Sequence, residues 1–202
     1  MSAPVFRAIL FDFDGTLTRP EAIDFAALRA LIQVPVGTPI LEYIQALPSA
    51  EEQARRLRIL EDFEAAAARK SVPNEGAEKT LRLLRDRGLK LGISSRNSRS
   101  SIDTALANFS SLSHADFHVI LTRENSGRQK PHPDAALKAA GLFGVTPAEM
   151  LVVGDFSFDI AAGHAAGSPT VLITNGSTQP QMDPPPHHVI RELGELSAII
   201  GF

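Results

Sequence analysis

The sequence contains no cysteine among its 202 residues. This absence excludes disulfide bonds, thiolate nucleophiles, and zinc or iron-sulfur sites that are held by cysteine. Any metal ion that the protein binds must therefore be held by oxygen or imidazole ligands.

An excess of basic residues is also absent. Lysine and arginine number 20 and aspartate and glutamate number 23, so the formal net charge is -3. Proteins that bind nucleic acids usually carry a basic surface that faces the phosphates. We therefore expect no nucleic-acid partner and a small molecule as the ligand.

Long hydrophobic runs are missing as well. The sequence has no apolar run of about 18 residues, the length that a membrane-spanning helix requires. The first residues, MSAPVFRAILFDFDG, lack the charged segment and long apolar segment of a targeting peptide. We therefore expect a cytoplasmic protein with no membrane partner, long enough for one sizeable core with a smaller inserted domain.

Five short apolar stretches are present, and several are continuous rather than alternating. They cover residues 5–11, 89–94, 118–121, 150–154 and 170–174. Continuous apolar strands are typical of a parallel sheet that helices cover on both faces. Helical patterns lie between them: residues 74–88 end at a glycine, and residues 132–141 begin near a proline and end at Gly141. The order predicts an α/β fold with a doubly wound, Rossmann-like parallel sheet.

Residues 19–72 interrupt this alternation with helical patterns alone. The patterns cover residues 20–32, 39–47 and 49–70, and Ser49 with Glu52 forms a capping box at the start of the last. The sequence therefore predicts a small all-α cap inserted after the first strand. The predicted boundaries are 1–17 and 75–202 for the α/β catalytic core and 18–74 for the helical cap. A proline-rich segment, residues 177–188, is predicted to be a loop.

Polar side chains follow three of the predicted strands at the point where each strand ends. They are Asp12 and Asp14, then Ser94, Ser95, Arg96 and Asn97, then Asp155 and Asp159. A turn or a helix cap would explain either acidic pair alone. The carboxyl ends of parallel strands, however, meet at the edge of the sheet where ligands bind. The convergence of three such ends indicates a functional site.

Lys130, in the segment RQKPHPD (128–134), is the candidate cation for this site. A buried carboxylate without a partner costs several kcal/mol, so a cluster of them needs positive charge nearby. A divalent ion together with Lys130 would supply it. Mg²⁺ is the metal that an oxygen-only ligand set favours.

Four segments carry a family resemblance: DFDGTLT (12–18), the serine after LGI (91–93), KPHPD (130–134) and VVGDFSFDIAAGHAAG (152–167). In order and spacing they resemble the haloacid dehalogenase superfamily of phosphohydrolases over nearly the whole chain. The branch it is most similar to, that of phosphoglycolate phosphatase and β-phosphoglucomutase, has a small helical cap after the first segment.

The resemblance implies roles for the catalytic residues. Asp12 would be the nucleophile that forms an aspartyl-phosphate, and Asp14 the general acid and then the general base. Lys130 would neutralise the nucleophile and the phosphate. Ser95 would hold the phosphoryl oxygens, with Ser94 as the alternative.

The resemblance also implies a Mg²⁺ cofactor. Its ligands would be the carboxylates of Asp12 and Asp155 and the backbone carbonyl of Asp14. Asp159 would lie close by or act through a water molecule.

The expected function is therefore that of a Mg²⁺-dependent phosphatase. Its substrate would be a small phosphorylated metabolite, similar to phosphoglycolate or a sugar phosphate, hydrolysed through an aspartyl-phosphate intermediate. Two alternatives stay open. A phosphomutase acting on a sugar phosphate would use the same core, and a non-catalytic binding protein would retain the same fold.

Overall fold

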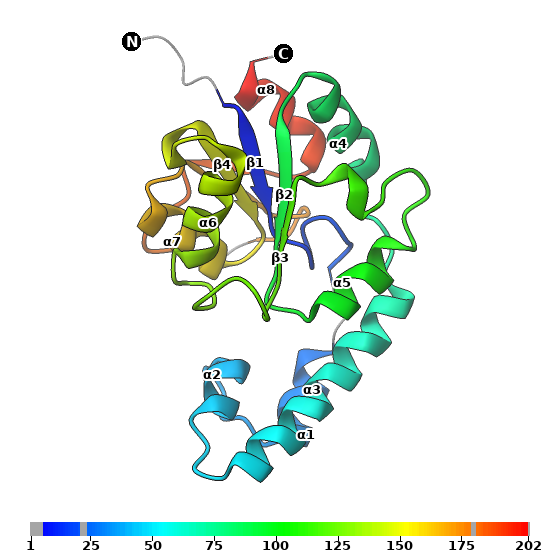
Figure 1. The fold of residues 1–202 in the computed structure, drawn as a ribbon, viewed down its shortest axis with the longest axis vertical. Helices are drawn as coiled ribbons and strands as arrows, with labels where there is room; N and C mark the ends of the chain where they lie inside the picture. The colour runs from blue at the N-terminus through cyan, green and yellow to red at the C-terminus, as the bar shows by residue number, and fades with distance from the viewer. Residues whose placement is uncertain (1–5, 21–23, 179–180, 202) are drawn as a thin grey trace.

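The computed structural model describes residues 6–20, 24–178 and 181–201. Its centre is a six-stranded sheet in which all neighbouring strands are parallel (Figure 1). The strands are β1 (Ala8–Phe11), β2 (Lys90–Ser94), β3 (Val119–Leu121), β4 (Met150–Gly154), β5 (Thr170–Ile173) and β6 (His188–Ile190). Their order is β3-β2-β1-β4-β5-β6. This order confirms the predicted doubly wound, Rossmann-like sheet.

Helices cover both faces of the sheet. On one face lie α4 (Ala77–Asp86), α5 (Arg99–Leu106) and α8 (Leu196–Ile200), and on the other lie α6 (Asp134–Phe143) and α7 (Ser157–Ala166). Single 3-10 turns complete the core: His114–Asp116, Pro147–Glu149 and Leu193–Glu195.

Strand β1 shows why the central strands appear in the sequence as continuous apolar runs. All four of its residues are buried. Ile9 and Phe11 belong to the apolar cluster under α4 and α5, while Ala8 and Leu10 belong to the cluster under α6. Since alternate side chains of a strand point to opposite faces, a strand between two helical layers needs apolar residues at every position.

Strand β6 is an element that the sequence analysis missed. It begins at His188, the last residue of the proline-rich segment predicted as a loop, and it pairs with β5. Only Ile190 of its three residues is buried. A three-residue edge strand with one buried side chain has too short a pattern to be recognised from sequence.

The end of α6 differs from the prediction. The helix continues through Gly141 to Phe143, so the predicted helix end at Gly141 is wrong. The C-terminal capping position is Gly144, which has φ +65°. Gly144 adopts the left-handed conformation that ends many helices, whereas Gly141 is an ordinary helical residue.

The insertion after β1 consists of helices, as predicted. Its helices are α1 (Phe25–Ile32), α2 (Ile40–Gln45) and α3 (Ala50–Lys70). α1 begins later than the predicted residue 20, because Asp24 caps it by accepting a hydrogen bond from the backbone N–H of Ala27; residues 21–23 lie outside the described residues. The three helices enclose an apolar cluster of their own, which includes Leu28, Ile44 and Leu60. Figure 1 shows this cap beyond the carboxyl ends of the strands.

Two linkers join the cap to the core, and they pair with each other. Thr18 and Pro73 form an antiparallel bridge. The backbone N–H of Arg19 donates to the carbonyl of Val72 at 3.0 Å, and that of Asn74 donates to the carbonyl of Leu17 at 2.8 Å. This pairing supports the boundaries at residues 18 and 74, which stay a prediction.

In the described part of the chain, no helix is both long and apolar enough to cross a bilayer.

Two helical glycines lead to opposite predictions for stability. A Cβ atom at Gly163 in α7 would lie 2.4 Å from Cγ2 of Thr170, whereas a Cβ atom at Gly141 would meet nothing within 4 Å. We expect Gly163→Ala to lower the free energy of unfolding by about 1–3 kcal/mol through overpacking. Gly141→Ala should raise it by about 0.5–1 kcal/mol through helix propensity. Urea denaturation measures both; a destabilised Gly141→Ala variant would contradict the assignment of Gly141 to the helix.

Candidate active site

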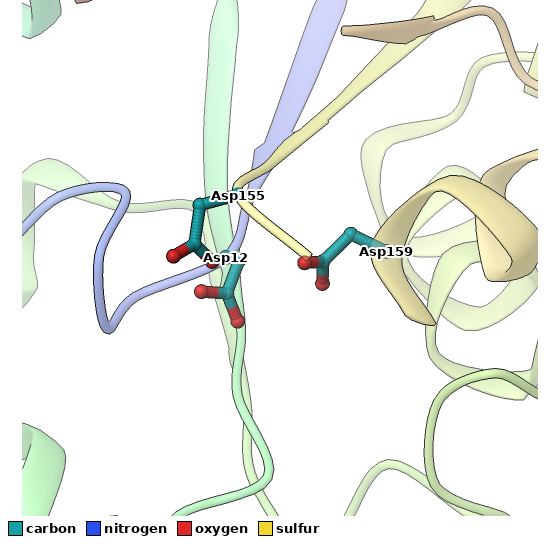
Figure 2. A group of neighbouring side chains, drawn as sticks. All are labelled: Asp12, Asp155 and Asp159. Atoms are coloured by element: carbon teal, nitrogen blue, oxygen red, sulfur yellow. The ribbon is translucent and has the colours of Figure 1, made fainter. Parts of the chain in front are cut away.

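The site lies where the carboxyl ends of β1 and β4 meet at the centre of the sheet. Asp12 directly follows β1, and Asp155 directly follows β4, which is its neighbour. Asp159 lies in the first turn of α7. One carboxylate oxygen from each of the three lies within 4.8 Å of the others, and Figure 2 shows the side chains converging. This is the switch point of the strand order, where ligands of such sheets bind.

Two glycines make room for these carboxylates. A Cβ atom at Gly15, where φ is +77°, would lie 2.1 Å from Oδ2 of Asp155. A Cβ atom at Gly154 would lie 2.3 Å from Cβ of Asp159. Any larger residue would displace the carboxylates, so the glycines of DFDG and VVGD are requirements of packing as well as of the turn.

Lys130 supplies the positive charge of the cluster. Its Nζ donates to Oδ1 of Asp12 at 2.5 Å, to Oδ1 of Asp159 at 2.6 Å and to the carbonyl of Ser94 at 2.9 Å. The side chain is buried, so all three ammonium hydrogens are used in a low-dielectric environment. Burial opposes the charged form, but the two carboxylates outweigh it and raise the pKa of Lys130.

The acidic side chains of the site repel one another. Burial raises the pKa of Asp12 well above its usual value, against the effect of Lys130 and together with the repulsion from Asp159 and Asp155. Burial, followed by repulsion from Asp159, raises the pKa of Asp155 to about 7. Positive charge in addition to Lys130 would therefore stabilise the ionised site.

Asp14 is oriented by Asn97, a residue that the sequence analysis placed after the second predicted strand but to which it assigned no role. Nδ2 of Asn97 donates to Oδ2 of Asp14 at 2.7 Å. Burial, followed by the charge of Glu64, raises the pKa of Asp14 to about 6. Asn97 follows the second predicted strand, and that position was its only signal in the sequence.

Ion pairs of Arg123 and Arg96 with cap carboxylates hold the cap against the site, and no local sequence pattern predicts these pairs. Glu64 on α3 is 3% exposed and accepts from Nη1 and Nη2 of Arg123 at 2.7 Å and 3.1 Å. Glu42 on α2 accepts from Nη2 of Arg96 at 2.6 Å. Arg96 also donates to the carbonyl of Lys130 at 3.1 Å and lies over the ring of Phe158. The cap therefore contacts the loops that carry the site.

The two candidate serines lie at the carboxyl end of β2 and are both buried. Ser94 lines a small cavity together with Asp12, Lys130 and Asp159. The hydroxyl of Ser95 accepts from the backbone N–H of Asn97 at 3.1 Å. The assignment of phosphate binding to Ser95, with Ser94 as the alternative, stays a prediction.

The donor set fits a divalent metal ion. All three converging groups are carboxylates, and the glycine at position 15 leaves space for that of Asp155. Oxygen ligands of this kind are those of Mg²⁺. Asp159 is more constrained than the other two, because its Oδ1 accepts from Lys130 and its Oδ2 accepts from the backbone N–H of Phe156 at 3.2 Å.

Comparison with known proteins gives consistent results. A family model for haloacid dehalogenase-like hydrolases matches residues 6–167. An uncharacterized hydrolase of Saccharomyces cerevisiae is 34% identical over 170 residues, which cover 84% of this chain and 78% of that protein. A phosphoglycolate phosphatase of Salmonella paratyphi A is 33% identical over 150 residues, covering 73% of this chain and 58% of that protein.

The fold is also shared with a solved structure from the predicted branch. The β-phosphoglucomutase of Clostridium difficile superposes with a TM-score of 0.76 at 20% sequence identity. The match covers 95% of this chain and 93% of that one. At this identity the likeness concerns the fold alone.

The crowding of carboxylates predicts how the protein responds to Mg²⁺. We expect Mg²⁺ to raise the melting temperature of the wild type, because a ligand that binds only the folded state stabilises it. Asp155→Asn should abolish this rise by removing a carboxylate of the cluster. Asp134→Asn, a change at a partly buried carboxylate outside the cluster that pairs with Arg128, should retain it. Differential scanning fluorimetry with and without Mg²⁺ measures each response, and an unaltered rise in Asp155→Asn would contradict the metal site.

The same variant has a predicted pH dependence without metal. Because the folded-state pKa of Asp155 is raised to about 7 from an ordinary 3.8, the folded protein binds more protons than the unfolded chain between these values. The free energy of unfolding of the wild type minus that of Asp155→Asn should therefore fall as the pH rises through this window. Above the window this difference should stay constant. Urea denaturation in chelator at pH 5 and pH 8 tests the sign of this change. A difference that is larger at pH 8 than at pH 5 would contradict it.

Proposed function

The chain belongs to the haloacid dehalogenase-like hydrolases, and from this basis we propose that it is a Mg²⁺-dependent phosphatase of small phosphorylated metabolites. The observation that carries the proposal is the carboxylate of Asp12, which lies beside Lys130 and Asp155 at the switch point of the sheet. Phosphoryl transfer requires an oxygen nucleophile, positive charge on the phosphoryl oxygens and a proton for the leaving group. The described residues supply each of these groups except part of the positive charge.

Mg²⁺, when bound, would supply that charge to the phosphoryl oxygens. We propose Asp12 and Asp155 as its carboxylate ligands, with the backbone carbonyl of Asp14. Asp159 would lie close to the ion or contact it through a water molecule, since both of its carboxylate oxygens already accept hydrogen bonds.

In the proposed reaction, an oxygen of Asp12 attacks phosphorus and the bond to the leaving oxygen breaks. Lys130 holds the nucleophilic carboxylate in place and offsets its charge, and Ser95 or Ser94 holds the phosphoryl oxygens. Asp14 donates the proton to the leaving oxygen. It then accepts a proton from the water that hydrolyses the aspartyl-phosphate.

The environment of Asp14 suits this double role. A pKa of about 6 lies near neutral pH, so both protonation states are accessible during turnover. The hydrogen bond from Asn97 leaves Oδ2 fixed and orients the carboxyl group.

The cap would exclude water and select the leaving group. Its contacts with Arg96 and Arg123 hold it over the loops of the site. Closure of such a cap strengthens the electrostatic interactions inside the site. The similarity to a phosphoglycolate phosphatase supports small phosphorylated acids as first substrates to test, followed by sugar phosphates.

A panel of phosphorylated metabolites, assayed with Mg²⁺ and with chelator, tests the proposal. We expect inorganic phosphate to be released from at least one ester and the release to stop in chelator. Isomerised sugar phosphate with little free phosphate would instead identify a phosphomutase. No turnover of any ester would favour a non-catalytic binding protein.

The two aspartates of DFDG should differ when substituted. Asp12→Asn should abolish turnover of every substrate, because an amide cannot form the aspartyl-phosphate. Asp14→Asn should still form it from an activated ester, whose leaving group needs little protonation, and should then stall for want of a base.

Rapid mixing of Asp14→Asn with an activated ester should therefore release about one leaving group per site in a burst, followed by slow turnover. Asp12→Asn serves as the control without a burst. A burst from Asp12→Asn, or wild-type turnover by Asp14→Asn, would contradict the assigned roles.

A further inference from the structure

Two asparagine side chains meet behind the turn that carries Asp14 and Gly15. Asn74 lies in the linker that returns from the cap, and Asn175 follows β5. Nδ2 of Asn74 donates to Oδ1 of Asn175 at 2.8 Å, and Nδ2 of Asn175 donates to the carbonyl of Gly15 at 2.7 Å. We call this pair the amide bridge.

The side chain of Asn74 makes further hydrogen bonds, and the backbone of Asn175 is in a strained conformation. Nδ2 of Asn74 also donates to the carbonyl of Thr16 at 2.9 Å, while its Oδ1 accepts from the backbone N–H of Glu75 at 2.8 Å. Asn74 is 9% exposed. Asn175 has φ +51°, a conformation that asparagine adopts more readily than most residues but still at a cost. The two hydrogen bonds of its side chain therefore indicate why asparagine occupies this strained position.

The amide bridge binds the carbonyl of Gly15, a residue that lies next to two acidic groups of the site. Gly15 follows Asp14, and a Cβ atom on Gly15 would lie 2.1 Å from Oδ2 of Asp155, so the turn is packed against that carboxylate. A shift of the Gly15 peptide would therefore move both acidic groups. The linker that carries Asn74 is also hydrogen-bonded to the other linker of the cap, so the turn lies next to the point about which the cap would move.

We propose that Asn74 and Asn175 are positioning residues for catalysis and for metal binding. They hold the Gly15 peptide so that Asp14 and Asp155 keep their geometry while the cap moves on its linkers. The role in catalysis rests on the proposed phosphatase function, whereas the role in metal binding can be measured without turnover.

Two substitutions remove the amide bridge and are compatible with the backbone conformation at their positions. Asn175→Gly deletes the side chain and tolerates the positive φ. Asn74→Asp keeps the acceptor for Glu75 and removes the donors. For each we expect kcat to fall about 10- to 100-fold with KM changed less than about threefold, because misplacement of catalytic groups affects the transition state most. The double variant should lose little more than either single variant, since both act on one peptide.

Asn108→Asp is the matched control. Nδ2 of Asn108 donates to the carbonyls of Ala68 and Ser71, both at 2.9 Å, at the end of α3 before the same linker. This amide also anchors the cap to the core, but it makes no bond to the turn at Gly15. Its loss should lower the melting temperature while leaving kcat and Mg²⁺ affinity unchanged.

Two measurements on the protein alone complete the test. Isothermal titration with Mg²⁺ should show affinity about tenfold weaker in Asn175→Gly and Asn74→Asp than in the wild type or Asn108→Asp. Hydrogen exchange of residues 13–18 should be faster in the first two variants only. If both keep wild-type exchange and Mg²⁺ affinity, the amide bridge is only structural and the proposal is wrong. If the wild type binds Mg²⁺ but turns over no ester, the phosphatase proposal fails, and these two measurements still decide the role of the amide bridge.

Discussion

Asp12, Asp155 and Asp159 place three carboxylates within a few ångströms of one another, and the ammonium group of Lys130 lies among them. Taking a single charge out of water costs several kcal/mol, so the cluster can persist only where opposite charge and hydrogen bonds offset that cost. Lys130 binds two of the carboxylates and a strand-end carbonyl. The remaining negative charge makes the site suitable for a divalent cation.

The sheet provides the geometry for this arrangement. Adjacent parallel strands end together, so Asp12 and Asp155 come from distant parts of the sequence to neighbouring positions. The glycines at positions 15 and 154 allow the carboxylates to approach the backbone closely. Helix α7 then adds Asp159 from its first turn, where an acidic side chain also accepts from a backbone N–H of the helix end.

The cap and the core share polar contacts that only the folded chain brings together. Glu64 and Glu42 reach from two cap helices to arginines of the core loops. Burial and then the charge of the buried Glu64 raise the pKa of Asp14, so the cap influences the protonation of the proposed acid and base. In this chain the cap and the candidate site are therefore coupled through the charges of Glu42, Glu64 and the two arginines.

The fold class, the helical insertion and the candidate acidic residues with Lys130 could all be predicted from the sequence. These depend on local patterns: continuous apolar strands, helical periodicity, and polar residues placed directly after strands. Strand β6 was not predicted, because a three-residue edge strand has almost no periodicity. The end of α6 was predicted wrongly, because either of two nearby glycines can end a helix. Asn97 was marked only by its place after a strand, and its bond to Asp14 was not predicted. Glu64 beside Asp14 and the amide bridge of Asn74 and Asn175 became known only from the tertiary structure. An asparagine or glutamate far along the chain carries no local mark of the carbonyl or carboxylate it will meet, because such contacts arise from the packing of separate segments and not from the pattern within any one of them.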